Sequence, residues 1–356
     1  MKNNQAPSLL AIAAAILFGA SAPISKSLLG SIDPLPLAAF LYIGSGLGSW
    51  LLLTIRNRHK PNRIVEERLS KPDIPWLIGA IFAGGVAAPI LLLLGLDRTP
   101  ASTASLLLNF ETVATALLAY LLFREAIGKR IFLAVGLITF ASILLTWNGG
   151  AWGFSLGSMA IVAACFLWGL DNNLTRNISG KDPMMIVGIK GFCAGTFSLL
   201  LVFIFKIPLP PIEPILIAIL VGAVCYGLSI QLFILALRGL GSARTGVLFG
   251  TAPFVGAILS LVFLNEIPPS FFWIALPIMG AGAWLMLTEK HGHEHTHTNH
   301  AHAHSHHHPE EHHLHDHPGE TGEFSGKHSH IHRHANLSHY HAHSPDLHHR
   351  HDHLES

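Results

Sequence analysis

The stretch that decides the fold class runs from Ala101 to Phe123 and reads ASTASLLLNFETVATALLAYLLF. Its only acidic or basic side chain is Glu111, which lies near the middle. A helix rises about 1.5 Å per residue, so roughly 20 apolar residues cross a hydrocarbon layer about 30 Å thick. The stretch therefore predicts a membrane-spanning helix that carries one carboxyl group near the middle of the bilayer.

The rest of the chain repeats this pattern. Of its 356 residues, 50% are hydrophobic and only 12% are acidic or basic, whereas soluble domains carry about 25% charged residues. This composition excludes an ordinary soluble enzyme, and the chain contains no nucleophile elbow or phosphate-binding loop. We predict an all-α integral membrane protein with ten transmembrane helices. The predicted spans are Leu9–Leu29, Leu35–Ile55, Ile74–Leu96, Ala101–Phe123, Ile131–Trp147, Leu156–Ile178, Met184–Phe205, Ile215–Leu237, Thr245–Leu264 and Phe271–Leu287.

Basic residues divide unequally between the two sides of the predicted bundle. The side opposite the N-terminus carries only Lys26, Arg98 and Lys206. Because positive charge marks the cytoplasmic side of a membrane protein, we expect both termini in the cytoplasm. The membrane is then the plasma membrane, in a bacterium the inner membrane. The loops on the N-terminal side contain Arg56, Arg58, Lys60, Arg63, Arg68, Lys71, Arg124, Lys129, Arg130, Arg176, Lys181, Arg238 and Arg244.

The two halves of the chain resemble each other. The pair Asp33-Pro34 returns as Asp182-Pro183, and Glu125 at the end of the fourth span corresponds to Glu266 at the end of the ninth. Because each repeat holds an odd number of spans, the second must insert upside down relative to the first, as in many secondary transporters. We therefore divide the chain into a first repeat at 1–148, a second repeat at 149–290 and a tail at 291–356.

These residues also resemble a known family. The run Leu96-Asp97-Arg98-Thr99-Pro100-Ala101-Ser102-Thr103-Ala104-Ser105, followed by Glu111 and by Phe123-Arg124-Glu125, resembles the fourth-helix signature of EamA-type transporters of the drug/metabolite transporter superfamily. The second copy reads Ala236-Leu237-Arg238-Gly239-Leu240-Gly241-Ser242-Ala243, then Pro253, then Leu264-Asn265-Glu266. The resemblance implies a ten-helix exporter or permease with a central cavity and a broad range of substrates.

The family pattern favours an acid–proline pair in this helix, and here the two features are split. The first copy keeps the acid in Glu111-Thr112, and the second keeps the proline in Ala252-Pro253. An ionisable group inside lipid is costly and is a functional candidate by default. Glu111 is therefore a candidate for proton coupling or cation binding, and the alternative is a structural carboxyl bonded to a neighbouring helix.

A second candidate site joins the sixth and seventh spans. Asp171 and Lys190 lie at similar distances from the loop between these spans, so we expect them at the same depth on adjacent helices. They form either a structural ion pair or part of the transport pathway, and Asn172 and Asn173 beside them favour the pathway slightly. Weaker polar candidates are Asn109, Tyr226 and Gln231, and candidate hinge or motif residues are Pro23, Pro253, Glu125 and Glu266.

The tail differs from the rest of the chain. Residues 291–356 hold 25 of the 26 histidines and almost no large apolar side chains, so we expect disorder. Neutral imidazoles at this density favour Zn, Ni or Co. The candidate ligands are His291, His293, His295, His297, His302, His304, His306, His328, His330, His332 and His334.

Three functions are compatible with these patterns. The first is a secondary transporter of small metabolites or drug-like solutes that requires no cofactor. The second is a divalent-metal transporter or a metal-regulated permease that uses the tail, and the third is a membrane scaffold or pH sensor without transport. An inverted repeat favours transport. We expect the bilayer and a small solute as partners and no nucleic acid, with a homodimer as an open alternative for the assembly.

Overall fold

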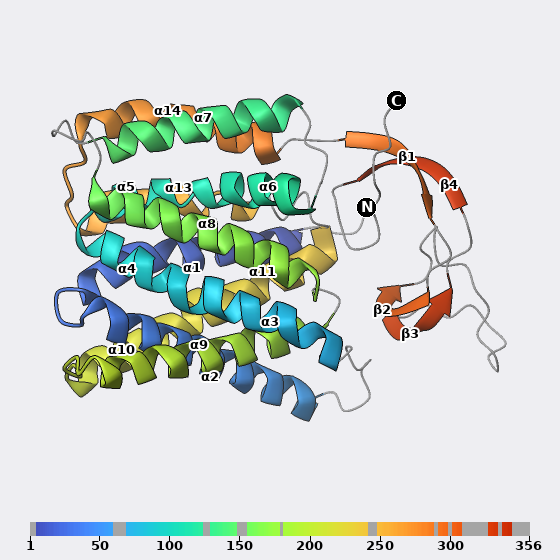
Figure 1. Ribbon diagram of the computed structural model, residues 1–356, viewed down its shortest axis with the longest axis horizontal. Helices are drawn as coiled ribbons and strands as arrows, with labels where there is room; N and C mark the ends of the chain where they lie inside the picture. The colour runs from blue at the N-terminus through green and yellow to red at the C-terminus, as the bar shows by residue number, and fades with distance from the viewer. Residues whose placement is uncertain are drawn as a thin grey trace.

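The computed structural model describes residues 5–59, 69–123, 129–147, 155–178, 181–240 and 248–287, and four tail segments at 291–297, 301–307, 327–333 and 337–343. Up to residue 287 the described chain folds into helices, as predicted (Figure 1). The helices of the first half are α1 (Gln5–Leu28), α2 (Pro34–His59), the short 3₁₀ turn η1 (Lys71–Asp73), α3 (Ile74–Ala80), η2 (Ile81–Ala87), α4 (Ala88–Asp97), α5 (Ala101–Leu107), α6 (Phe110–Phe123) and α7 (Lys129–Thr146). Those of the second half are α8 (Leu156–Arg176), α9 (Pro183–Ile204), α10 (Ile212–Val221), η3 (Gly222–Leu228), α11 (Ser229–Leu240), α13 (Ala252–Phe263) and α14 (Ser270–Leu287).

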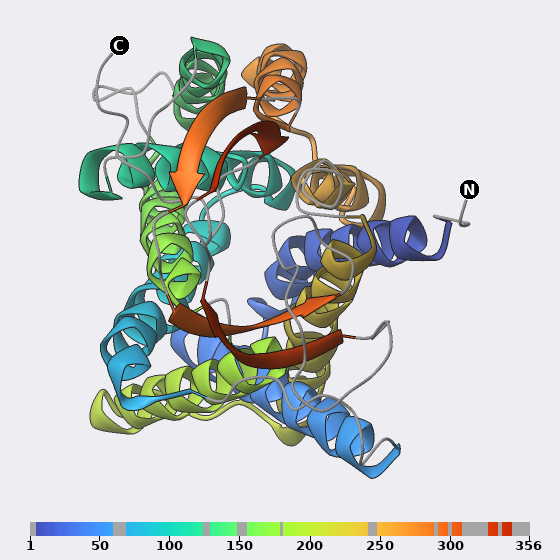
Figure 2. The same ribbon diagram turned by 90° about the vertical axis from the view of Figure 1, so that its right-hand side faces the viewer.

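The helices lie side by side in one bundle. In Figure 1, α1 begins at the end of the bundle where α14 ends, and successive helical segments run back and forth along it. Figure 2 looks along the helices and shows them arranged around a common centre. α2 packs along α9, and α7 packs along α14. α1 contacts α11 and α13, and α8 makes the corresponding contacts with α4 and α6.

The exterior of the bundle is apolar. Phe263 and Trp284 expose 74% and 64% of their surface, as expected of side chains that face lipid rather than water. Within the described residues, six helical stretches are long and apolar enough to cross a membrane; three apolar helices, 130–146, 252–263 and 270–285, are shorter. The six long stretches are Ala6–Leu28, Pro34–Arg56, Lys71–Asp97, Ala101–Leu122, Pro183–Ile204 and Ile212–Ala236.

Within the residues that the structure describes, three helical rods are interrupted, and the hydropathy of the sequence did not predict these breaks. η2 and η3 are turns of π-helix, and each lies in the middle of an otherwise α-helical rod. They occupy equivalent places, since Ile81 and Gly222 are 141 positions apart, the same interval that separates Glu125 from Glu266. A third rod breaks between α5 and α6. Such interruptions release backbone carbonyls and often mark functional sites.

Small residues bring α2 and α9 together. A Cβ atom added to Gly191 would lie 2.6 Å from the backbone nitrogen of Gly46, so only hydrogen fits there. This close approach of two backbones is typical of helix packing in membranes, where small residues replace the hydrophobic effect as the cause of association.

The tail differs from our expectation of disorder. Four of its segments are β-strands in antiparallel pairs, β1 with β4 and β2 with β3, and they lie beyond the end of the bundle at which α14 ends (Figure 1). The physical reason is the alternation of histidine with small residues, a period of two that matches a strand. The strands are β1 (His291–His297), β2 (Ala301–His307), β3 (Lys327–Arg333) and β4 (Leu337–His343).

Candidate functional site inside the helix bundle

The first part of the site is built around Glu111 on α6. Its Oε1 atom accepts a hydrogen bond from Asn172 Nδ2 at 2.8 Å, and the same amide donates to Thr115 Oγ1 at 3.1 Å. Glu111 is half-buried and Asn172 is exposed. Among the described residues no side chain donates to the second oxygen, Oε2. This oxygen therefore has lone pairs available to a proton or to a hydrogen-bond donor.

The break between α5 and α6 fixes the place of Glu111. At the break, Asn109 Nδ2 donates to the carbonyl of Leu106 at 3.0 Å, and Thr112 Oγ1 donates to the carbonyl of Asn109 at 2.7 Å. Glu111 follows in the first turn of α6, where the helix dipole favours a negative charge. The predicted residue Asn109 thus stabilises the break, and its amide group bonds to backbone.

The second part of the site is an ion pair between Asp171 on α8 and Lys190 on α9. Thr175 Oγ1 donates a further hydrogen bond to Asp171 Oδ1 at 3.0 Å. The Asp171 side chain is only 6% exposed and that of Lys190 is 18% exposed, so each needs the charge of the other. The structure therefore brings together the two residues for which the sequence predicted a common depth.

Three further residues were missed from the sequence. The carbonyl of Gly84, which lies in the π-helical turn η2, accepts hydrogen bonds from Tyr42 Oη at 2.7 Å and from Trp168 Nε1 at 3.0 Å. A Cβ atom at Gly84 would lie 2.5 Å from Asp171 Cβ, so the turn is pressed against the ion pair. The available signal was Gly84-Gly85 within an apolar stretch, together with a tyrosine and a tryptophan that need partners in lipid.

Other predicted residues lie around this cluster or away from it. Asn173 donates to the carbonyls of Gly169 at 2.8 Å and Thr115 at 3.1 Å, so it joins α8 to α6. The ring of Tyr226 lies 6.0 Å from that of Tyr42. Gln231 is buried elsewhere, beside the end of α2. Pro23 lies inside α1, and Pro253 lies in the first turn of α13.

Of the two motif glutamates, the structure describes only Glu266. Glu266 caps α5: its carboxylate accepts hydrogen bonds from the backbone N–H of Ala101 at 2.7 Å and from the N–H and hydroxyl of Ser102, both at 2.8 Å. Glu125 lies outside the described residues.

The predicted metal ligands lie in the tail. His293 faces His341 in the β1–β4 pair, and His304 faces His330 in the β2–β3 pair. Of the eleven predicted ligands, His334 lies outside the described residues. The other ten occupy strand positions, for which the structure describes the backbone and not the side chains. Among the described side chains, no group of three or more His, Cys, Asp or Glu residues gathers around one point.

An apolar exterior, interrupted helices and charged groups in the interior together define a multi-pass membrane protein with a polar interior. Comparison with known proteins gives the family. The model of the EamA-like transporter family matches residues 6–147 and again residues 155–288. The chain therefore belongs to the EamA-like transporter family, as its fourth-helix motif indicated, and it is a transporter and not an enzyme.

Individual relatives agree with this assignment. An uncharacterized transporter of Methanothermobacter thermautotrophicus is 33% identical over 271 residues, which is 72% of this chain and 78% of the relative. A protein of Chlamydia trachomatis named S-adenosylmethionine/S-adenosylhomocysteine transporter is 24% identical over 298 residues, 78% of this chain and 87% of that protein. A solved crystal structure, titled only as that of a protein, shares the fold with a TM-score of 0.57 and 18% identity, covering 78% of this chain and 94% of its own.

Proposed function

We propose that this protein is a secondary transporter that moves a small metabolite or drug-like solute across the cytoplasmic membrane by alternating access. Glu111 and Asn172 bind the solute or a coupling proton, and the Asp171–Lys190 pair lies beside them in the pathway. The observation that carries this proposal is the Glu111 carboxylate, which has one oxygen without a side-chain donor among the described residues and interacts electrostatically with both Asp171 and Lys190. A charged cluster of this kind is retained inside a membrane protein for function rather than for stability.

Alternating access requires two modules that rock against each other, and we propose ten spans arranged as two inverted repeats of five. Three features support this arrangement. The contacts of α1 correspond to those of α8, the π-helical turns η2 and η3 occupy equivalent places, and α1 and α8 run in opposite directions in Figure 1. In transporters with this architecture the solute binds between interrupted helices near the middle of the bilayer.

The first solute to test is S-adenosylmethionine, because the chlamydial relative is named for its transport. Its positive groups would suit the carboxylate of Glu111, and its purine ring would suit the aromatic rings of Tyr42 and Tyr226, which lie near each other.

Flux into proteoliposomes tests this proposal. Glu111→Gln keeps the side-chain shape and removes the charge, and we expect it to abolish solute uptake driven by a proton gradient. Glu213→Gln is the matched control, because Glu213 lies exposed in the first turn of α10. Unchanged proton-driven flux in Glu111→Gln would contradict the coupling role. Counterflow without a gradient then shows whether solute binding remains.

A second candidate function is transport of a divalent metal or regulation by one. Histidines paired across both tail ladders favour it, because opposed residues in a ladder lie close together. A chain that ends at Lys290 decides between the two functions. Loss of zinc flux after truncation supports metal transport, whereas organic solute flux that persists supports an accessory tail.

We also propose that both termini lie in the cytoplasm and that the two repeats meet near residue 149. Labelling of single cysteines by a membrane-impermeant reagent tests the orientation. Labelling of the two ends from opposite sides of the membrane would contradict it.

A further inference from the structure

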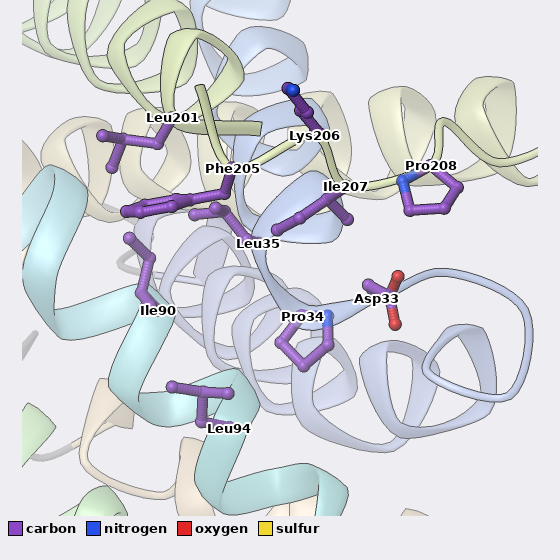
Figure 3. Close-up of a pocket in the computed structure, with 10 residues that line it drawn as sticks. All are labelled: Asp33, Pro34, Leu35, Ile90, Leu94, Leu201, Phe205, Lys206, Ile207 and Pro208. Atoms are coloured by element: carbon purple, nitrogen blue, oxygen red, sulfur yellow. The ribbon is translucent and has the colours of Figure 1, made fainter. Parts of the chain in front are cut away.

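A pocket of about 680 Å³ opens between α2, α4 and α9 at the end of the bundle opposite the termini (Figure 3). Its walls are apolar and include Leu94 and Phe205, and its polar groups are Asp33, just before α2, and Lys206, just after α9. Figure 3 shows these two charged residues at separate edges of the pocket. Within the part of the chain that the structure describes, neither side chain belongs to an ion pair.

The repeat places an equivalent groove at the other end of the bundle. Asp33 corresponds to Asp182 (33 to 182, 149 positions), Lys206 to Arg56 (56 to 206, 150 positions) and Leu94 to Leu235 (94 to 235, 141 positions). Asp182, just before α9, and Arg56, near the end of α2, thus repeat the arrangement of Asp33 and Lys206 with the helices exchanged.

This second groove is shut. It retains a cavity of only about 10 Å³. The Arg56 guanidinium donates two hydrogen bonds to the Asp182 carboxylate, at 2.5 and 3.3 Å, and so joins α2 to α9. The two grooves therefore have the same parts in opposite states, with the ion pair formed where the groove is closed and separated where it is open.

Each groove has one further distinguishing detail. The Gln231 side chain lines the shut groove, and its buried Nε2 has no hydrogen-bond partner among the described residues, an unmet group that opening would hydrate. At the open groove, Lys206 adopts a left-handed backbone conformation with φ of 53°. The bonds from Ile207 N to Val202 O at 3.0 Å and from Lys206 N to Phe203 O at 3.2 Å hold it at the end of α9.

We propose that Asp33–Lys206 and Arg56–Asp182 are a pair of reciprocal latches, of which one forms as the other breaks when the transporter changes its access. This inference rests on the proposed alternating access and adds the residues that hold each state. An attraction present in only one state biases the equilibrium toward that state. Removal of the Arg56–Asp182 attraction must therefore open its groove and close the groove between Asp33 and Lys206.

Distances between spin labels test the latches without any solute. One label pair replaces Leu94 and Phe205 across the open groove, and the other replaces Ile55 and Leu235, the corresponding exposed residues of the shut groove. Cys165, Cys193 and Cys225 are replaced by serine beforehand. Asp182→Asn removes the charge and keeps an oxygen that can accept the bond from Met184 N, so α9 retains its cap. Arg56→Gln breaks the same ion pair from the other partner.

We expect both variants to shorten the 94–205 distance and to lengthen the 55–235 distance. Since the Asp182 side chain is only 9% exposed, the ratio of the two states should change by at least roughly fivefold, the upper end for a solvent-exposed ion pair. Arg130→Gln, an exposed basic residue on α7 at the same end of the bundle, should change neither distance. Opening of the 55–235 groove without closure of the other, or no change in either, overturns the proposal. Coupled distances without solute flux would refute the proposed transport and leave the latches standing.

Discussion

Gly84 shows how much one residue without a side chain determines in this site. Its carbonyl binds Tyr42 and Trp168, and its missing Cβ leaves room for Asp171. We expect Gly84→Ala to separate Asp171 from Lys190 and to lower the free energy of unfolding by about 1–3 kcal/mol, as overpacking does. Thermal unfolding in detergent measures this loss. Gly136→Ala on α7 is the control, since nothing lies within 4 Å of the added Cβ. Equal unfolding temperatures of Gly84→Ala and Gly136→Ala would contradict this prediction.

Variants of the Asp171–Lys190 pair distinguish a structural role of this ion pair from a role in transport. Asp171→Asn leaves the partly buried Lys190 without its partner, and we expect a loss of up to about 3 kcal/mol in unfolding free energy. The exchanged double variant Asp171→Lys/Lys190→Asp restores the attraction. If the pair is structural, the exchange recovers both stability and flux. We expect it to recover stability and not flux, because a solute meets the two charges in reversed positions. Recovery of flux would contradict our placement of the pair in the pathway.

At the scale of elements, hydropathy predicted where the helices lie and not where they are interrupted. A hydropathy window responds to the length of an apolar run, and the hydropathy of Ile74–Leu96 is high throughout. The π-helical turn η2 lies within this run, and the partners of its Gly84 carbonyl, Tyr42 and Trp168, come from other helices. Depth along a helix is different: it follows from counting residues, so the approach of Asp171 to Lys190 was predictable. The cap at the start of α5 was not, because Glu266, which provides it, lies in the opposite half of the chain.

Loss of the Glu266 cap should weaken the start of α5. Glu266 accepts bonds from two backbone N–H groups at the start of α5, which a single amide oxygen in Glu266→Gln cannot match. We expect a loss of about 0.5–1 kcal/mol in local stability, typical of a weakened helix cap. Hydrogen exchange should become severalfold faster at Ala101 and Ser102. Glu213→Gln, in the first turn of α10, should leave these amides unchanged. Equal exchange in Glu266→Gln and the unmutated protein would show that the cap contributes nothing.

At the scale of the whole molecule, the chain joins two parts that rest on different chemistry. The helical part depends on apolar surface, helix packing and a few buried polar contacts. The tail strands pair with one another beyond the end of the bundle and depend on backbone pairing (Figure 1). Two-stranded ladders have little stability in water on their own. A metal bound between opposed histidines would add the missing stability, because metal binding and folding are coupled.

This division predicts that the two parts respond differently to metal. Zinc binding should be lost when the chain ends at Lys290, whereas the unfolding temperature of the helical part should stay the same. Titration calorimetry of zinc into both chains, with thermal unfolding of each, measures the two effects. Binding should weaken as pH falls through about 6.5, because a protonated imidazole cannot ligate a metal. The control replaces His59 with glutamine, which removes the single histidine outside the tail and should change nothing. Zinc affinity that survives truncation would instead place the metal within the membrane part and would make metal the first candidate for the transported solute.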